Sequence, residues 1–199
     1  IDRKDIRIGD TVLIQRAGDV IPEVVKVIIS DRIKSSIPYK IPKICPECKC
    51  EAKKVEDDVV LRCINENCKA KVLGCLEHYV SKNCMNIDGL GIKIIQLLLD
   101  ENLISNIGDI YLLKKENLAP LDRMGDKSAK NIIDAINESK KTDLHRFLHG
   151  LGIKHVGQNA SKILERQYNG NIKNIIKATK DELINVNEIG EVMADSIVS

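Results

Sequence analysis

Asp88-Gly89-Leu90-Gly91 begins a pattern that returns three more times and decides how most of the chain folds. In each copy an apolar residue precedes a glycine, and a stretch with helical spacing follows. The other copies are Arg123-Met124-Gly125, His155-Val156-Gly157 and Glu188-Ile189-Gly190. The final glycines, at positions 91, 125, 157 and 190, are spaced 34, 32 and 33 residues apart. Recurrence at such a period indicates tandem supersecondary units.

The stretches after the glycines are predicted to be helices. Apolar residues recur at helical spacing over residues 92–101, 126–139, 158–168 and 191–198. Four residues after each glycine stand mostly small side chains, namely Ile95, Ala129, Ser161 and Ala194. A period near 33 residues also fits α-solenoids, but the tetratricopeptide and ankyrin signature residues are missing. The apolar–glycine pair before each helix favours a helix–hairpin–helix motif instead.

A hairpin of this kind suits a phosphate group. The first N–H groups of a helix have no intrahelical partner and favour an anion, and glycine lets another backbone come close. A structural turn explains any one hairpin, but four at a regular period favour phosphate binding. The candidate DNA-binding residues of the hairpins are Gly89, Leu90, Gly91, Lys93, Gly125, Lys127, Gly157, Asn159 and Gly190.

The hairpins differ in the charge of the residue two positions after the final glycine. Lys93 and Lys127 follow their glycines by two residues, whereas Asn159 and Val192 hold that position in the third and fourth copies. We therefore expect the first two hairpins to be stronger phosphate contacts than the fourth. From residue 80 onward the chain has 16 basic and 16 acidic residues, so backbone amides and a few placed cations would hold DNA. Contacts with the phosphate backbone do not depend on the base sequence.

The first 38 residues have a β pattern. Residues 11–16 and 20–29 are predicted strands, joined by a turn at residues 17–19. Pro22 indicates an edge or a bulge early in the second strand. Two strands are not stable alone in water, so we expect further strands outside this sequence. The start at Ile1 instead of Met likewise suggests a piece of a longer protein.

The cysteines between residues 39 and 72 have metal-ligand spacing. They form C-x2-C, 14 intervening residues, then C-x4-C, and the predicted ligands are Cys45, Cys48, Cys63 and Cys68. Four thiolates close the tetrahedral shell of zinc, so the ion would be structural. Cys50 could replace Cys48 in an alternative set. Cys75 and Cys84 are interpreted as small buried apolar residues.

Composition excludes several classes of protein. The 199 residues carry a net charge of +2, and 43% are hydrophobic, which is ordinary for a globular protein. Only 3% are aromatic, which favours several small aliphatic cores. No apolar run is long enough to span a membrane, and the charged first residues lead us to expect no signal peptide here. Seven cysteines suit no complete disulfide framework, so we expect a reducing, cytoplasmic compartment.

No complete catalytic constellation is present in the sequence. His145 and His149 have the spacing of zinc-protease histidines, but the glutamate of that motif is absent. We expect both to serve packing or the surface, and His78 and His155 to have structural roles. Asp57-Asp58 is interpreted as a solvated turn. We therefore predict no catalytic residue within these 199 residues.

Residues 5–12 (DIRIGDTV) and 16–22 (RAGDVIP), followed by a four-cysteine finger and four hairpins, resemble bacterial NAD-dependent DNA ligases. The likeness covers the whole chain. It implies a multi-domain, mainly α fold with a small β part. Residues 1–38 would be the end of an OB-fold, residues 39–72 a zinc finger, and residues 73–199 a helix-hairpin-helix domain. The hairpins would lie near 88–91, 123–125, 155–157 and 188–190.

The resemblance also implies a reaction and a partner. In that family a K-x-D-G lysine takes AMP from NAD and passes it to a DNA 5′-phosphate, and the 3′-hydroxyl then displaces the AMP. Arg16, Val20 and Ile21 would lie in the minor groove beside the nick, and the hairpins would grip the duplex in a ring-shaped clamp. The expected partner is nicked duplex DNA, bound by a monomer. Zinc is the cofactor expected here, with NAD and Mg bound elsewhere in the parent enzyme.

The sequence departs from the family pattern at two points. No K-x-D-G is present; the nearest string is Asn86-Ile87-Asp88-Gly89, so the sequence is expected to lack adenylation activity. Arg123, His155 and Glu188 replace the first hairpin glycine, and Glu188 would repel a phosphate. We therefore expect the fourth hairpin to pack against its neighbour. Two rival hypotheses are a DNA-binding module of another repair protein and a protein-binding helical scaffold.

Overall fold

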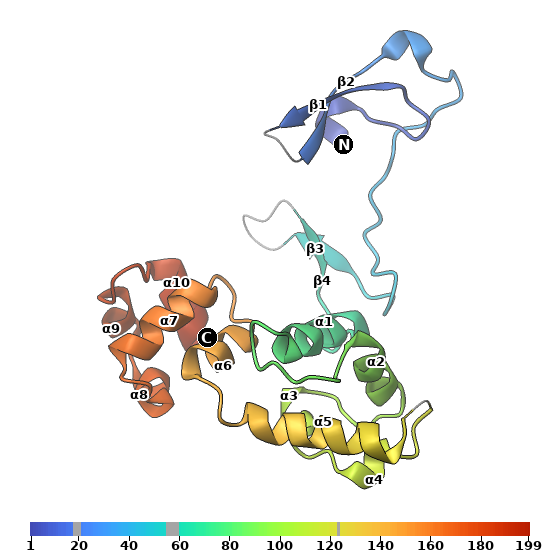
Figure 1. Ribbon diagram of the computed structural model, residues 1–199. Helices are drawn as coiled ribbons and strands as arrows, with labels where there is room; N and C mark the ends of the chain where they lie inside the picture. Colours follow the sequence, from blue (N-terminus) through green and yellow to red (C-terminus); the bar gives the residue numbers. More distant parts are fainter. Residues whose placement is uncertain (18–20, 55–59, 123) are drawn as a thin grey trace. The chain divides into compact units, whose positions relative to one another are not determined.

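A computed structural model describes residues 1–17, 21–54, 60–122 and 124–199. The chain separates into two compact units, Ile1–Ile64 and Asn65–Ser199 (Figure 1). Two small antiparallel sheets lie in the first unit, and helices make up the second. The predicted mainly α fold with a small β part is confirmed. No helix of the described segments is long and apolar enough to cross a membrane.

The first sheet pairs β1 (Val12–Ala17) with β2 (Ile21–Val27), close to the predicted strands. The second strand, predicted to reach residue 29, ends at Val27, because Ile28 is the N-cap of the 3-10 helix η2 (Ile29–Asp31). In a two-stranded sheet both strands are edges, which accommodates Pro22. The bulge lies between Leu13 and Ile14 of β1 instead. The predicted turn residues 18 and 19 lie outside the described residues.

An arginine holds the start of the chain in place. The Arg32 guanidinium donates to the Asp10 carboxylate at 2.9 Å and to that of Asp5 at 2.7 Å. The Arg7 side chain donates to Asp5 as well, and together the two arginines lower the pKa of Asp5 to about 2. This network joins the segment around the 3-10 helix η1 (Asp2–Lys4) to the residue that follows η2.

The second sheet pairs β3 (Ala52–Lys54) with β4 (Leu61–Cys63), and a bridge from Ile44 to Glu51 extends it. This hairpin connects the two cysteine pairs, as the 14-residue spacing between them suggested. Asp57-Asp58, interpreted above as a turn, lies outside the described residues.

The second unit is built from helices joined by short links. Their bounds are α1 (Lys69–Val80), α2 (Ile92–Asp100), α3 (Ile107–Ile110), α4 (Lys115–Leu118), α5 (Asp126–Ser139), α6 (Leu144–Gly150), α7 (Gln158–Gln167), α8 (Ile172–Lys177), α9 (Lys180–Ile184) and α10 (Glu191–Val198). The four predicted helices correspond to α2, α5, α7 and α10, with ends within one residue. The helical region begins at Lys69 instead of near residue 73. The remaining helices span seven residues or fewer apart from α1, which is too short for periodicity to reveal.

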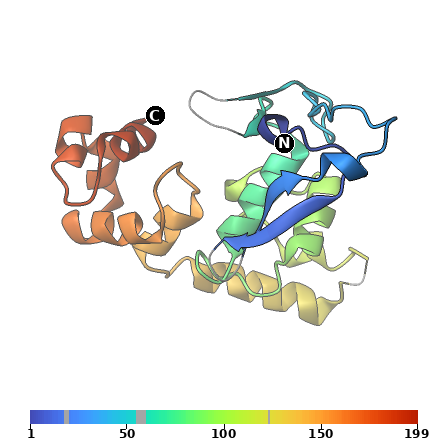
Figure 2. The same ribbon diagram turned by 90° about the horizontal axis from the view of Figure 1, so that it is seen from above.

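The helices surround two separate cores. One core runs from α1 to α5 and the other from α6 to α10, and the two groups are distinct in both views (Figures 1 and 2). This agrees with the expectation of several small aliphatic cores. The residues four after the hairpin glycines, three of which are small, are fully buried: Ile95, Ala129, Ser161 and Ala194.

Helix α6 joins the two groups because it packs against α1. The Arg146 side chain donates to the backbone carbonyl of Cys84 at 2.7 Å, and His78 and the carbonyl of His149 are hydrogen-bonded at 2.8 Å. Gly150 lies so close to α1 that a β-carbon there would meet the Tyr79 ring at 3.1 Å. Close approach of the two helices therefore depends on the missing side chain.

We predict that Gly150→Ala lowers the free energy of unfolding by about 1–2 kcal/mol, because the new methyl group overpacks the contact with Tyr79. Gly74→Ala in α1 is the matched control, since nothing lies within 4 Å of a β-carbon there. It should raise stability by roughly 0.5–1 kcal/mol through helix propensity. Urea denaturation of both variants tests this, and a Gly150→Ala protein as stable as the control would contradict the packing argument.

Candidate functional site

The hairpins share one backbone geometry. The residue two before the final glycine has a left-handed backbone: φ is +82° at Gly89, +65° at His155 and +64° at Glu188. Position 123, the equivalent in the second copy, lies outside the described residues. A residue other than glycine is strained in this region. His155 and Glu188 therefore fill positions that favour glycine, in agreement with the sequence analysis, which aligned them with the first hairpin glycine.

A buried apolar side chain follows in each hairpin. These anchors are Leu90, Met124, Val156 and Ile189, each at most 7% exposed. Their N–H groups donate to the carbonyl three residues earlier, at 3.0 to 3.3 Å. A tight turn and a buried anchor thus fix the point at which the next helix begins.

That point is a glycine in every case. Gly91, Gly125, Gly157 and Gly190 are the N-cap residues of α2, α5, α7 and α10, with φ between −76° and −102°. Glycine has no side chain that could cap these helices. By contrast, the side chains of Asn106, Asn171 and Thr179 cap α3, α8 and α9. The helices that follow hairpins therefore present their first N–H groups uncapped.

The protein itself does not require glycine at these N-caps. Nothing lies within 4 Å of a β-carbon built at Gly91, Gly125, Gly157 or Gly190, and any residue can adopt their φ values. Gly89 differs, because a β-carbon there would meet Ile132 at 3.1 Å. Each N-cap glycine thus leaves an open surface over a cluster of backbone N–H groups, where an anion could approach closely.

Charged neighbours distinguish the hairpins. Lys93 and Lys127 are exposed beside the first two N-caps. The Asn159 side chain donates to the Glu188 carboxylate at 2.9 Å, so the third and fourth hairpins lie side by side. We expected the fourth hairpin to pack against its neighbour, but the sequence did not identify these two residues, which are 29 positions apart.

The fourth hairpin is followed by acidic residues. Glu191 lies in the first turn of α10, and Lys180 pairs with both Glu191 at 3.2 Å and Asp195 at 2.6 Å. These partners raise the pKa of Lys180. The Lys180 ammonium group is therefore already paired with carboxylates of the protein. Glu188 adds a further negative charge near the fourth hairpin.

The remaining predicted DNA contacts lie in the first sheet. Arg16 and Ile21 are exposed near the facing ends of β1 and β2, where Arg16 pairs with Pro22. Val20 lies outside the described residues. The exposed side chain of Ile21 leaves an apolar group free to contact a surface.

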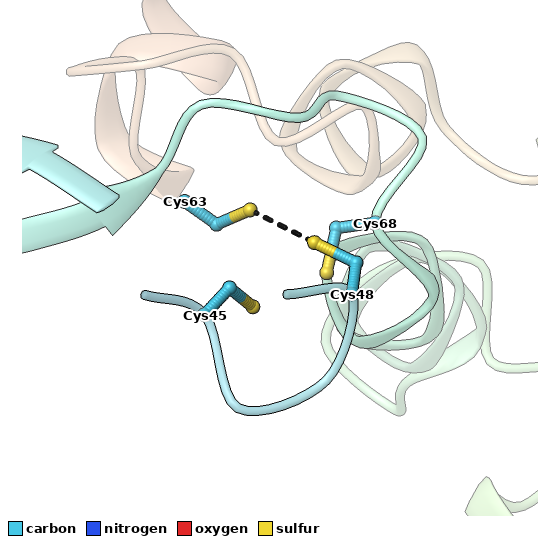
Figure 3. Close-up of side chains that lie close together, drawn as sticks. All are labelled: Cys45, Cys48, Cys63 and Cys68. Carbon is cyan, nitrogen blue, oxygen red and sulfur yellow. Dashed lines mark hydrogen bonds between the residues drawn. The ribbon is translucent and has the colours of Figure 1, made fainter. Parts of the chain in front are cut away.

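The four predicted metal ligands converge on one point (Figure 3). The Sγ atoms of Cys45, Cys48, Cys63 and Cys68 all lie within 4.8 Å of one another, and those of Cys48 and Cys63 are 3.4 Å apart. Tight backbone turns bring each pair together: Lys49 donates to the Cys45 carbonyl at 3.1 Å, and Cys68 to that of Asn65 at 3.2 Å. This cluster could hold a metal ion. It contains Cys48 and not the alternative Cys50.

Other cysteines and histidines partly differ from expectation. Cys84 is buried as predicted, but Cys75 is exposed, so its predicted burial was wrong. His145 packs against Glu165, with Nδ1 2.8 Å from the carboxylate. His149 and His78 are not isolated, because α6 and α1 bring them together with Cys84. No pattern in the sequence indicated this group, because its members come from distant segments.

We predict that serine has opposite effects at the two glycines of the first hairpin. Gly91→Ser should leave stability unchanged or raise it by about 0.5 kcal/mol, because serine is a favoured N-cap. Gly89→Ser should lower it by roughly 1–2 kcal/mol, since the residue would be left-handed and crowd Ile132. Thermal and urea unfolding measure both. Equal losses at the two positions would contradict the assigned backbone roles.

Comparisons with known proteins agree with this geometry. A family model described as the NAD-dependent DNA ligase OB-fold domain matches residues 1–36. Models of a SAM-like helix-hairpin-helix tandem and of a helix-hairpin-helix motif match residues 83–138 and 146–199. These two matches coincide with the two helical cores.

Curated relatives match the chain over its full length. It is 49% identical over 199 residues to a DNA ligase of Listeria monocytogenes, and 46% identical over 199 residues to one of Bacillus subtilis. A DNA ligase of Lysinibacillus sphaericus is 47% identical over 195 residues. The alignments cover 98–100% of this chain but only 29–30% of each relative. By its sequence the chain therefore belongs to the NAD-dependent DNA ligase family, as a segment that corresponds to OB-fold-domain sequence followed by helix-hairpin-helix motifs.

Proposed function

We propose that this chain is the part of an NAD-dependent DNA ligase that grips duplex DNA around a nick, through its phosphate backbone and without sequence preference. The supporting observation is the set of four N-cap glycines that the fold itself does not require. Each stands at an uncapped helix N-terminus. A bound phosphate would explain both features, because it needs free N–H donors and a surface without a side chain.

The hairpins contribute unequally in this proposal. Gly89, Leu90 and Gly91, with Lys93, would form the first phosphate contact, and Gly125 with Lys127 the second. Gly157 and Asn159 would form a weaker third, because Asn159 already binds Glu188. At Gly190 the nearby Glu188 and Glu191 would repel a phosphate, so the fourth hairpin would mainly support the third.

The first unit would act at the break itself. By the likeness to the ligases, Arg16, Val20 and Ile21 would enter the minor groove beside the nick. The exposed Arg16 and Ile21 of the sheet suit a cation near phosphates and an apolar contact with the sugar edge. Residues 1–38 would thus serve as the end of an OB-fold, residues 39–72 as a zinc finger and residues 73–199 as the hairpin domain.

We propose zinc for the four-cysteine cluster. Sulfur-only coordination by four thiolates suits Zn²⁺ and leaves no position for water, so the ion would stabilise the fold and take no part in the reaction. Its thiolates must stay reduced, which fits a cytoplasmic protein. The adenylation steps, with NAD and Mg, would use residues outside this sequence, because it contains no K-x-D-G. The segment would act as a monomer.

Replacement of Gly91 and Gly125 by serine should weaken duplex binding at least tenfold. The new hydroxyls would cap the N–H groups that a phosphate needs, and the side chains would hold it away. Fluorescence anisotropy with nicked duplex, intact duplex and single strand over a salt series measures this. The wild type should bind duplex, prefer the nick, and weaken steeply with salt.

One control and one further variant accompany this test. Gly74→Ala changes a glycine of α1 far from any hairpin turn in sequence, and it should bind as the wild type does. Lys93→Glu combined with Lys127→Glu should abolish duplex binding if the first two hairpins dominate. Unchanged affinity in both the serine and the glutamate variants would rule out phosphate binding by these hairpins and favour a protein scaffold.

Cys63→Ser should lose one bound zinc ion per chain and unfold the β3–β4 hairpin, because metal binding and folding are coupled at such sites. Metal analysis and circular dichroism measure the loss. Cys50→Ser is the matched control, since Cys50 lies outside the cluster, and it should retain zinc. Loss of zinc in the control with retention in Cys63→Ser would overturn the ligand assignment.

A further inference from the structure

A second group of metal-binding side chains lies where α6 packs on α1. His78 comes from α1, Cys84 from the segment after it, and His149 from α6. One ligand atom of each lies within 4.8 Å of those of the other two. The group shares no residue with the four-cysteine cluster and has no part in the proposed DNA contacts.

The three side chains differ in exposure, because His78 and His149 are partly buried and Cys84 is buried. Cys84 is fully buried, and its Sγ lies 3.6 Å from Nε2 of His78. The two imidazole rings meet edge to face, with centroids 4.9 Å apart. The sulfur and both rings therefore lie together in the contact between α1 and α6.

One ring nitrogen of His149 lacks a partner among the described residues. Nδ1 of His149 is buried and has no hydrogen-bond partner in the described structure. Buried polar atoms are nearly always satisfied by protein, water or an ion. Burial and the neighbouring His78 also lower the pKa of His149. The atom is thus available to an additional bound species.

We propose that His78, Cys84 and His149 bind a second metal ion, of the borderline-soft divalent class represented by Zn²⁺. Two imidazoles and one thiolate suit zinc, whereas Mg²⁺ and Ca²⁺ require oxygen ligands. With three protein ligands, the fourth position is left to water. The ion would tie α1 to α6 and so fix one helical core against the other.

Loading the site requires small, defined changes. Ligands of one tetrahedral zinc ion lie roughly 3.3–3.8 Å apart, so the three side chains must close from their present spacing. The Cys84 thiol releases its proton on binding. The hydrogen bond between Nε2 of His78 and the His149 carbonyl must open if that nitrogen becomes the ligand. We therefore expect weaker binding here than at the four cysteines.

The test counts metal ions on the full 199-residue chain, equilibrated with excess zinc and then dialysed. The wild type should hold two ions, Cys84→Ala one, and the Cys63→Ser, Cys84→Ala double variant none. Cys84→Ala keeps the β-carbon that faces Gly150, so folding should survive; circular dichroism checks this. Cys75→Ser, an exposed cysteine outside both groups, is the matched control and should hold two ions.

Cobalt substitution gives a second readout. Co²⁺ at the new site should add a thiolate charge-transfer band that Cys84→Ala removes and His149→Gln shifts, while the four-cysteine spectrum stays unchanged. One ion in the wild type would overturn the proposal. So would two ions and unaltered cobalt spectra in both variants, because the second ion would then lie elsewhere.

Discussion

A left-handed residue directly before a buried apolar side chain is the constraint on which the helical unit depends. At Gly89, His155 and Glu188 the backbone is left-handed, and the next side chain anchors the turn in a core. The anchor is as important as the turn, because burial of Leu90, Val156 or Ile189 determines where the following helix begins. Two of the three positions accept strain to keep this geometry, so the buried anchor outweighs the cost of a left-handed residue.

The same constraint assigns different roles to glycines that look equivalent in the sequence. Gly89 serves the fold, since its φ of +82° and its contact with Ile132 both exclude a side chain. Gly91, two residues later, meets neither restriction. Its missing side chain matters only to a molecule that approaches from outside. A hairpin therefore combines one glycine that shapes the backbone with one that leaves the helix N-terminus open.

Scarcity of aromatic residues shapes how the cores meet. Three of the five aromatic side chains, Tyr79, Tyr111 and Phe147, gather in edge-to-face contacts with ring centroids 6.3 and 6.4 Å apart. Phe147 belongs to α6 but packs against the first core. These aromatic side chains are thus concentrated where one helical group joins the other, and aliphatic residues, mainly Leu and Ile, fill most of both cores. The polar group of His78, Cys84 and His149 lies in this same contact.

The sequence by itself determined the local features of this protein: the helices α2, α5, α7 and α10, the hairpin before each, and the four cysteines with metal-ligand spacing. Periodicity and spacing act over a few residues, so a single sequence reveals them. Only the tertiary structure decided which hairpins lie together, as Asn159 and Glu188 show, and which histidines and cysteines meet across α1 and α6. It also showed Cys75 to be exposed and separated the role of Gly89 from that of Gly91. Those outcomes depend on packing between distant segments, which no local pattern encodes.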